Sequence, residues 1–219
     1  MFRIPRQEIE DYGAFNISLA ADLPLFIDPF LLFNSKKQEY RRLHDQIIKY
    51  VQFLRDKSED EKPDSGLFKA WYRFPEIKQS WLGFSVSGNK GSGLGQSDFA
   101  IALHSSLNKL FSDFGKEKTA KGSHLEKLCP IKELVGKDNI SDFTTNLIHE
   151  YLLAYIERFA QEHINKHLRK LREQFTVEKV HFNHDTETWE HLADSTCHTV
   201  EENVFFFAPR DMLTTMTLG

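Results

Sequence analysis

The chain has few cysteines and no long apolar run. Cys129 and Cys197 are its only cysteines, which excludes the framework of several disulfides that stabilises small secreted proteins. The longest apolar stretch, residues 23–33, contains Asp28 and two prolines and is too short to span a bilayer. The N-terminal residues lack the apolar region of a signal peptide. These absences predict a soluble cytoplasmic protein with no membrane partner.

A strong charge of one sign is absent as well. The chain carries 28 lysines and arginines against 32 aspartates and glutamates, a net charge of −4, so its overall charge does not attract nucleic acid. Nucleic-acid binding would therefore need a local basic patch. Four cations at the start of a predicted helix form one candidate patch: Lys36, Lys37, Arg41 and Arg42. These cations either bind the phosphate backbone of a nucleic acid or form a helix face that contacts only solvent.

Enough apolar residues are present for a packed core. They make up 40% of the 219 residues, which excludes a disordered chain, and the 19 phenylalanines can bury large areas. Helical spacing of apolar residues predicts three main helices, over residues 34–55, 97–114 and 141–172. Short apolar segments predict strands at 81–87 and 204–208 and a hairpin around 183–186. We expect one α+β domain over residues 1–219, with the helices packed on a small mixed sheet.

Polar residues mark the starts of these helices. Asn34 or Ser35 is the expected N-cap of the first and Ser141 that of the third, because their side-chain oxygens can accept hydrogen bonds from the first amides of a helix. Residues 25–33 precede the first helix. Two prolines interrupt them, so we expect a short buried strand followed by a turn.

The predicted strand at 204–208 is followed only by a polar tail, residues 210–219. We expect no packed element in this tail. Such an ending fits either the N-terminal part of a longer protein or the loose terminus of a domain.

A glycine-rich segment lies between a predicted strand and a predicted helix. Four glycines surround a lysine there: Gly88, Lys90, Gly91, Gly93 and Gly95. Converging backbone amides, the positive end of a helix and a lysine are features that bind phosphate. The segment matches neither the phosphate-binding loop of nucleotide hydrolases nor the dinucleotide fingerprint, which has one more residue between its glycines. It is either a phosphate contact or a flexible connection.

Acidic and amide side chains gather at the start of the third predicted helix. Asp138 and Asp142 flank the start of the helix, and Asp142, Asn146 and His149 or Glu150 fall near one face, away from the apolar stripe. Carboxylate and amide oxygens are ligands for Mg²⁺ or Mn²⁺, so Asp138 and Asp142 are candidate metal ligands, and these two with Asn146 are candidate catalytic residues. Alternatively, the two aspartates only favour the positive end of the helix and remain solvated.

Two further patterns are weaker. Pro63-Asp64 followed by Glu76-Ile-Lys78 has the acids and lysine of many nucleases, but Pro75 is unsuited to the central strand that such a site needs. His163 and His167 have a spacing that can hold a metal, although histidines at a helix end are commonly solvated. The remaining histidines near the C-terminus lack the regular spacing of zinc sites.

Two strings, Trp81-Leu-Gly-Phe-Ser85 and Asp138-Asn-Ile-Ser-Asp-Phe-Thr-Thr-Asn146, resemble segments of uncharacterised bacterial proteins of the kind found beside restriction and phage-defence genes. This resemblance implies a nuclease or a sensor of nucleic acid. It makes Asp138 and Asp142 the first residues to test, and it implies a chain longer than this one.

Two functions from different classes follow. The first is a metal-dependent nuclease or nucleic-acid-processing domain, in which Lys90 and the loop amides contact phosphate while Asp138 and Asp142 hold the cation. The second is a non-catalytic interaction module, or the truncated remnant of a defence-related protein, whose exposed aromatic residues bind a protein partner.

Overall fold

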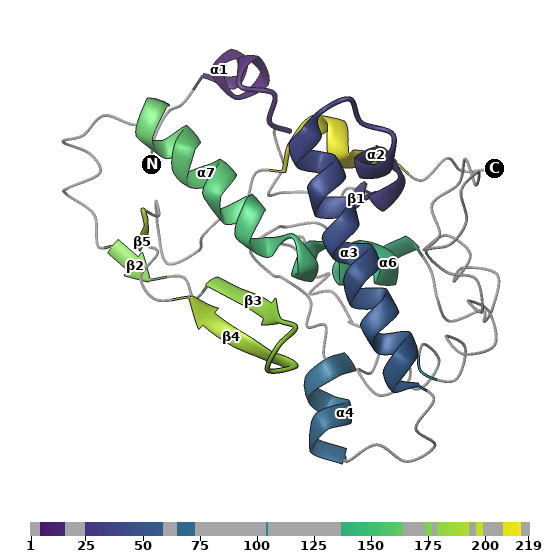
Figure 1. Ribbon diagram of the computed structural model, residues 1–219. Helices are drawn as coiled ribbons and strands as arrows, with labels where there is room; N and C mark the ends of the chain where they lie inside the picture. Colours follow the sequence, from purple (N-terminus) through teal and green to yellow (C-terminus); the bar gives the residue numbers. More distant parts are fainter. Residues whose placement is uncertain are drawn as a thin grey trace, which may run out of the picture. The chain divides into compact units, whose positions relative to one another are not determined.

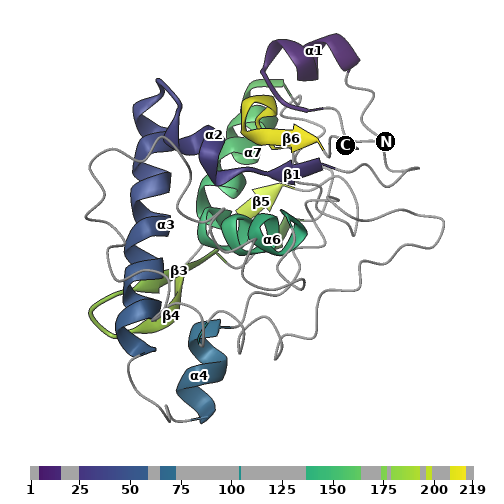
Figure 2. The same cartoon turned by 90° about the vertical axis from the view of Figure 1, so that its right-hand side faces the viewer.

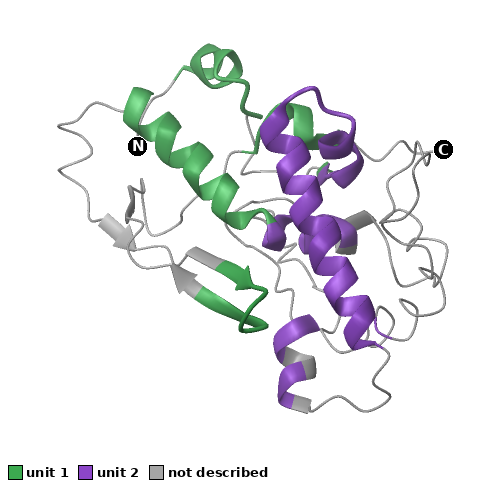
Figure 3. Cartoon of the chain, in the orientation of Figure 1, with its two compact units in different colours: residues 1–25, 77–91, 148–219 green, residues 26–76, 92–147 purple. Residues whose placement is uncertain are grey.

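Helices and short strands are both present, which confirms the expected α+β class (Figure 1). The computed structural model describes residues 5–15, 25–58, 65–72, 104, 137–163, 174–176, 179–192, 196–198 and 208–215. The chain divides into two compact units (Figure 3). One holds residues 1–25, 77–91 and 148–219, and the other holds residues 26–76 and 92–147. The expectation of one domain stays a prediction.

The longest helix is α3, Gln38–Lys57. Its predicted apolar face is buried, which confirms the periodicity of Tyr40, Leu43, Ile47, Tyr50, Val51 and Leu54. The predicted N-caps were wrong. Lys37 occupies the cap position without a capping side-chain bond, and the Ser35 hydroxyl accepts from the Lys37 amide at 3.1 Å.

The helix starts late because another helix precedes it. The buried strand β1, Leu25–Ile27, is as predicted, but the expected turn after it is helix α2, Pro29–Phe33. Asp28 caps α2 by accepting from the Phe30 amide at 2.8 Å, and proline suits the first helical position because no amide is needed there. Helix α2 packs on α3 (Figure 2), where the rings of Phe33 and His44 lie 5.0 Å apart.

Helix α4, Ser65–Tyr72, was not predicted. Its last two residues are buried and hydrogen-bonded to α3. The Tyr50 hydroxyl donates to the Trp71 carbonyl at 2.5 Å, and the Tyr72 hydroxyl donates to the Leu54 carbonyl at 3.3 Å. Burial raises the pKa of Tyr72, so its hydroxyl remains a donor at neutral pH. These contacts between helices explain a helix that local periodicity does not indicate.

The third predicted helix is two helices, α6 (Lys137–Leu147) and α7 (His149–His163). The boundary between the two units falls between residues 147 and 148. Ser141 was wrongly predicted to be the N-cap, because α6 begins one turn earlier and buries Ser141. The predicted extension to residue 172 lies outside the described residues.

Helix α7 packs on a β-hairpin within its unit. Strands β3 (Lys179–Asn183) and β4 (Thr188–Leu192) are antiparallel, as predicted, with Phe182 opposite Trp189. Strands β2 (Gln174–Thr176) and β5 (Thr196–His198) form a second antiparallel pair. The sequence had predicted a mixed sheet, whereas both of these pairs are antiparallel.

The C-terminal segment is packed, contrary to expectation. Residues 210–212 form the short helix η3 and residues 213–215 form strand β6. The Phe15 amide donates to the Ala208 carbonyl at 3.0 Å, the Arg210 amide donates to the Gly13 carbonyl at 2.9 Å, and Met212 is fully buried. The expected loose tail was wrong because these backbone bonds join it to a segment almost two hundred residues earlier.

Several predicted elements lie outside the described residues. They are the strand at 81–87, most of the strand at 204–208, and the helix over 97–114 except for His104. Within the described part of the chain, no helix is long and apolar enough to cross a membrane.

Candidate functional site

Helix α6 carries the predicted acidic site, and its buried face explains the orientation of the helix. Ile140, Phe143 and Thr145 are buried, together with Ser141 and Thr144. The Ser141 hydroxyl accepts from the buried Ile27 amide at 2.9 Å, and the Thr145 hydroxyl donates to the Ser141 carbonyl at 2.6 Å. This side of α6 therefore faces the interior of its own unit.

Asp142 and Asn146 lie on the other side of α6, where both are half-buried. The Asn146 side-chain amide donates to the Asp142 carbonyl at 2.8 Å, so it is held against its own helix. Asp138 belongs to the same helix one turn before Asp142, and its side chain lies outside the described residues. A four-residue spacing along a helix puts all three residues on one stripe.

The stripe offers oxygen ligands of the kind that Mg²⁺ and Mn²⁺ prefer. The described residues contain no group of three or more histidines, cysteines, aspartates and glutamates placed to hold a metal ion. A cation bound to α6 would thus depend on Asp138 and Asp142, with the Asn146 amide or water completing its coordination.

The predicted phosphate-binding loop cannot be placed beside this stripe. Gly88, Lys90, Gly91, Gly93 and Gly95 all lie outside the described residues. The nuclease-like pattern of Asp64, Glu76 and Lys78 lies outside them too. The expectation that the loop and α6 form one site stays a prediction.

The basic start of α3 is exposed to solvent. Lys36, Lys37, Arg41 and Arg42 are all exposed, in the same unit as α6. Lys37 folds back on its own helix, where its ammonium donates to the Tyr40 hydroxyl at 3.2 Å and lies 4.5 Å from the ring centroid. The other three cations extend from the surface.

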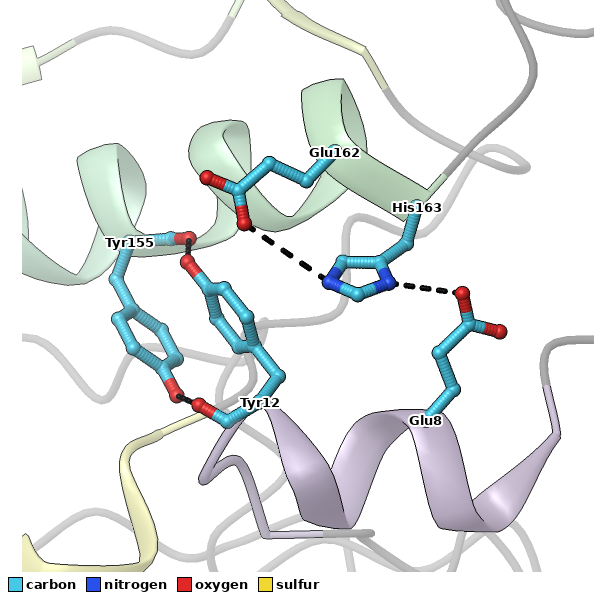
Figure 4. Close-up of polar contacts among 5 residues, drawn as sticks. All are labelled: Glu8, Tyr12, Tyr155, Glu162 and His163. Carbon is cyan, nitrogen blue, oxygen red and sulfur yellow. Dashed lines mark hydrogen bonds and ion pairs between the residues drawn. The ribbon is translucent and has the colours of Figure 1, made fainter.

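A polar cluster that the sequence did not predict joins α1 (Arg6–Asp11) to α7 (Figure 4). The Tyr12 hydroxyl donates to the Tyr155 carbonyl at 3.0 Å, and the Tyr155 hydroxyl donates to the Tyr12 carbonyl at 3.3 Å. About two turns further along α7, His163 Nδ1 lies 2.8 Å from Glu8 Oε1, and His163 Nε2 lies 3.9 Å from Glu162 Oε2. We call these five residues the α1–α7 clasp.

The electrostatics of the clasp favour a structural role. Burial raises the pKa of Tyr12, an effect that Arg158 opposes, and burial with help from Tyr12 raises the pKa of Tyr155. Both phenols therefore remain hydrogen-bond donors at neutral pH instead of bases. The His163 ring also stacks on Phe159, at 4.7 Å between centroids. The four-residue spacing of Tyr155, Phe159 and His163 was the sequence signal for this aromatic stripe.

The histidines form no metal centre within the described part of the chain. His163 contacts Glu8 and stacks on Phe159, and its predicted metal partner His167 lies outside the described residues. Burial lowers the pKa of His149 to about 4, so this residue is neutral near pH 7.

One family profile matches almost the whole chain. The model of the domain of unknown function DUF8370 covers residues 3–218. The chain therefore belongs to the DUF8370 family. No curated protein and no solved structure matches the chain.

Proposed function

We propose that this DUF8370 domain processes nucleic acid with a divalent cation, Mg²⁺ or Mn²⁺, bound at α6. Asp138 and Asp142 are the anionic ligands, and Asn146 is a third oxygen donor or a positioning group. The observation that carries the proposal is the two-sided character of α6. Its buried face uses Ser141 and Thr145, while the half-buried Asp142 and Asn146 share the opposite stripe.

The chemistry is hydrolysis of a phosphodiester. A divalent cation held by Asp138 and Asp142 would polarise a phosphoryl oxygen and so favour attack by water. Oxygen from water bonds to phosphorus, the bond from phosphorus to the leaving sugar oxygen breaks, and a proton from water ends on that oxygen. The phosphate contact expected of Lys90 and the glycine-rich segment stays a separate prediction, because these residues lie outside the described residues. The resemblance of residues 138–146 to segments of defence-associated bacterial proteins supports a substrate of this class.

The first test is cation binding, followed through thermal stability. Mg²⁺, Mn²⁺ and Ca²⁺ are titrated into the wild type and into the Asp138→Ala/Asp142→Ala double variant. A ligand at 100 times its Kd stabilises the native state by about 2.7 kcal/mol. At about 2–4 °C per kcal/mol for a chain of this size, the wild-type Tm should rise by about 5–10 °C. The double variant should show no rise.

A matched control separates ligand loss from charge loss. Asp45→Ala/Asp185→Ala removes two exposed aspartates elsewhere and should keep the metal-dependent rise. The quantity compared is the rise on adding metal, because removing acids near a helix start changes the baseline Tm as well. If the α6 double variant responds to the metals as the wild type does, the proposed site is wrong. If metal raises the Tm of the wild type but not that of the α6 double variant, cleavage of DNA and RNA is then assayed with the wild type, the double variant and the control variant.

The alternative of an interaction module receives no particular support from the described surface. Leu67, at 45% exposure, is the one large apolar side chain that is exposed among the described residues. The exposed aromatic cluster on which that alternative depended is not found within that part of the chain. The alternative therefore stays a prediction.

A further inference from the structure

We propose that the exposed side of α3, together with Lys36 just before the helix, is a docking surface for the phosphate backbone of double-stranded nucleic acid. The surface consists of Lys36, Arg41, Arg42 and Lys49. The choice of nucleic acid as the polyanion rests on the proposed function, but the docking itself requires neither the cation nor the residues of α6.

The helix geometry places three of these cations on the exposed side of α3, and Lys36 precedes the helix. Tyr40, Ile47 and Leu54 mark the buried side of α3. At 100° per residue, Arg42 and Lys49 lie on the side opposite to them, and Arg41 lies on the flank, about 90° around the helix from that line. Each of these cations is exposed, and the exposed positions from 36 to 49 carry five cations and two carboxylates. The net charge of this face is thus positive in a chain whose total charge is −4.

The side chains of the four cations have no partner among the described residues. None of them makes a side-chain hydrogen bond or an ion pair with the described residues. Other arginines of the chain do: Arg6 pairs with Glu10 at 2.6 Å, and Arg55 pairs with Asp56 at 2.7 Å. Asp45 lies on the cationic face without pairing with its neighbours there. An incoming phosphate therefore breaks no ion pair with a described residue.

The spacing suits a duplex. Arg42 and Lys49 are seven residues apart, which is about 10 Å along a helix at 1.5 Å per residue. That length corresponds to about three base pairs at 3.4 Å each. Arginine can also hold a phosphate through two parallel hydrogen bonds. A row of cations of this length matches one stretch of phosphate backbone.

The same face argues against a membrane surface. Helices that lie on membranes insert large apolar side chains beside their cations. Between Gln38 and Lys49 the exposed residues of α3 are all polar or charged, because the apolar side is buried in its own unit. This face can attract a partner only through its positive charge. A duplex, with its dense row of negatively charged phosphates, is the partner that such a face attracts most strongly.

The test measures the binding constant K for a fluorescent 20-base-pair duplex of mixed sequence. Binding is measured in EDTA at salt concentrations from 50 to 200 mM. Four phosphate contacts predict a slope of about −3.6 for log K against log salt, or a loss of binding on the order of 100-fold across this range. Arg41→Gln/Arg42→Gln should halve the slope, so that the loss falls to about tenfold. Asp45→Asn should strengthen binding.

Three comparisons decide the outcome. The control Arg6→Gln/Arg210→Gln removes two exposed arginines elsewhere and should bind as the wild type does. If the Arg41→Gln/Arg42→Gln variant binds the duplex as tightly as the control variant does, the docking surface is wrong. It is also wrong if the wild type binds vesicles rich in phosphatidylserine more tightly than it binds the duplex. Asp138→Ala/Asp142→Ala should bind the duplex unchanged in EDTA. A result in which duplex binding requires Arg41 and Arg42 while no metal ion raises the Tm of the wild type would support the docking surface and reject the metal site.

Discussion

At the scale of single residues, two hydroxyl groups lie about one turn apart on the buried face of α6. They differ in whether they form a hydrogen bond with another described residue. The Ser141 hydroxyl accepts the hydrogen bond of the Ile27 amide, and both groups are buried. The Thr144 hydroxyl is fully buried and has no hydrogen-bond partner among the described residues. Burial of a polar group is favourable only when it is hydrogen-bonded, so the two side chains should contribute to stability with opposite signs.

We predict that Ser141→Ala lowers the free energy of unfolding by about 1–3 kcal/mol, because the Ile27 amide loses its partner. Thr144→Val keeps the shape of the side chain and removes the unpaired hydroxyl, so it should raise the free energy of unfolding by about 1 kcal/mol. Denaturant unfolding of the two variants measures both effects. Destabilisation by Thr144→Val comparable with that of Ser141→Ala would mean that Thr144 has a partner in solution.

At the scale of elements, the α1–α7 clasp explains how a six-residue helix remains in place. A helix as short as α1 is unstable alone, and its single buried residue, Ile9, contributes little. The reciprocal bonds between Tyr12 and Tyr155 and the contact of Glu8 with His163 attach it to α7. Ile9 also joins a small buried cluster with Tyr155.

We expect Tyr12→Phe to destabilise the docking of α1 by about 1 kcal/mol, because one buried hydrogen bond is lost while the ring contacts remain. Amide hydrogens of α1 should then exchange about fivefold faster, without a matching change in α3. Gln7→Ala removes an exposed hydrogen bond to Asp11 inside α1 and is the control, with little expected effect. Unchanged exchange in Tyr12→Phe would show that the clasp does not hold α1.

At the scale of the whole molecule, one buried histidine should couple overall stability to acidity. Burial lowers the pKa of His149 to about 4, against an ordinary value of 6.5. Above pH 6.5 both folded and unfolded chains hold this histidine neutral, so its contribution to stability is fully present. As the pH falls from 6.5 to 4, the unfolded chain binds a proton that the folded chain does not, and stability is lost.

The predicted loss from this residue is up to about 3 kcal/mol between pH 6.5 and pH 4. In His149→Gln the side chain does not titrate, so the free energy of unfolding should fall less over the same range. The comparison cancels the other acidic and histidine groups, which titrate in both proteins. Parallel curves for the wild type and the variant would contradict a neutral, buried His149.

Much of the molecule followed from local patterns. The apolar periodicity of α3, the hairpin of β3 and β4 and the buried strand β1 were all predicted, because each depends on residues that are neighbours in the sequence. The two predicted carboxylates and Asn146 share α6 for the same reason, since helical spacing alone puts them on one stripe.

Tertiary contacts decided the rest. The Ser141 hydroxyl bonds an amide 114 residues away, and Tyr12 pairs with a tyrosine 143 residues away, so neither partner could be found from spacing. Helix α4 depends on acceptors and aromatic rings of α3, and the packed C-terminal segment depends on backbone bonds to residues 13–15. Sequence by itself determined which faces are apolar or charged, because side-chain chemistry and backbone period are local. Tertiary structure alone decided which polar groups are paired when buried, because only the folded chain brings distant donors and acceptors within hydrogen-bonding distance.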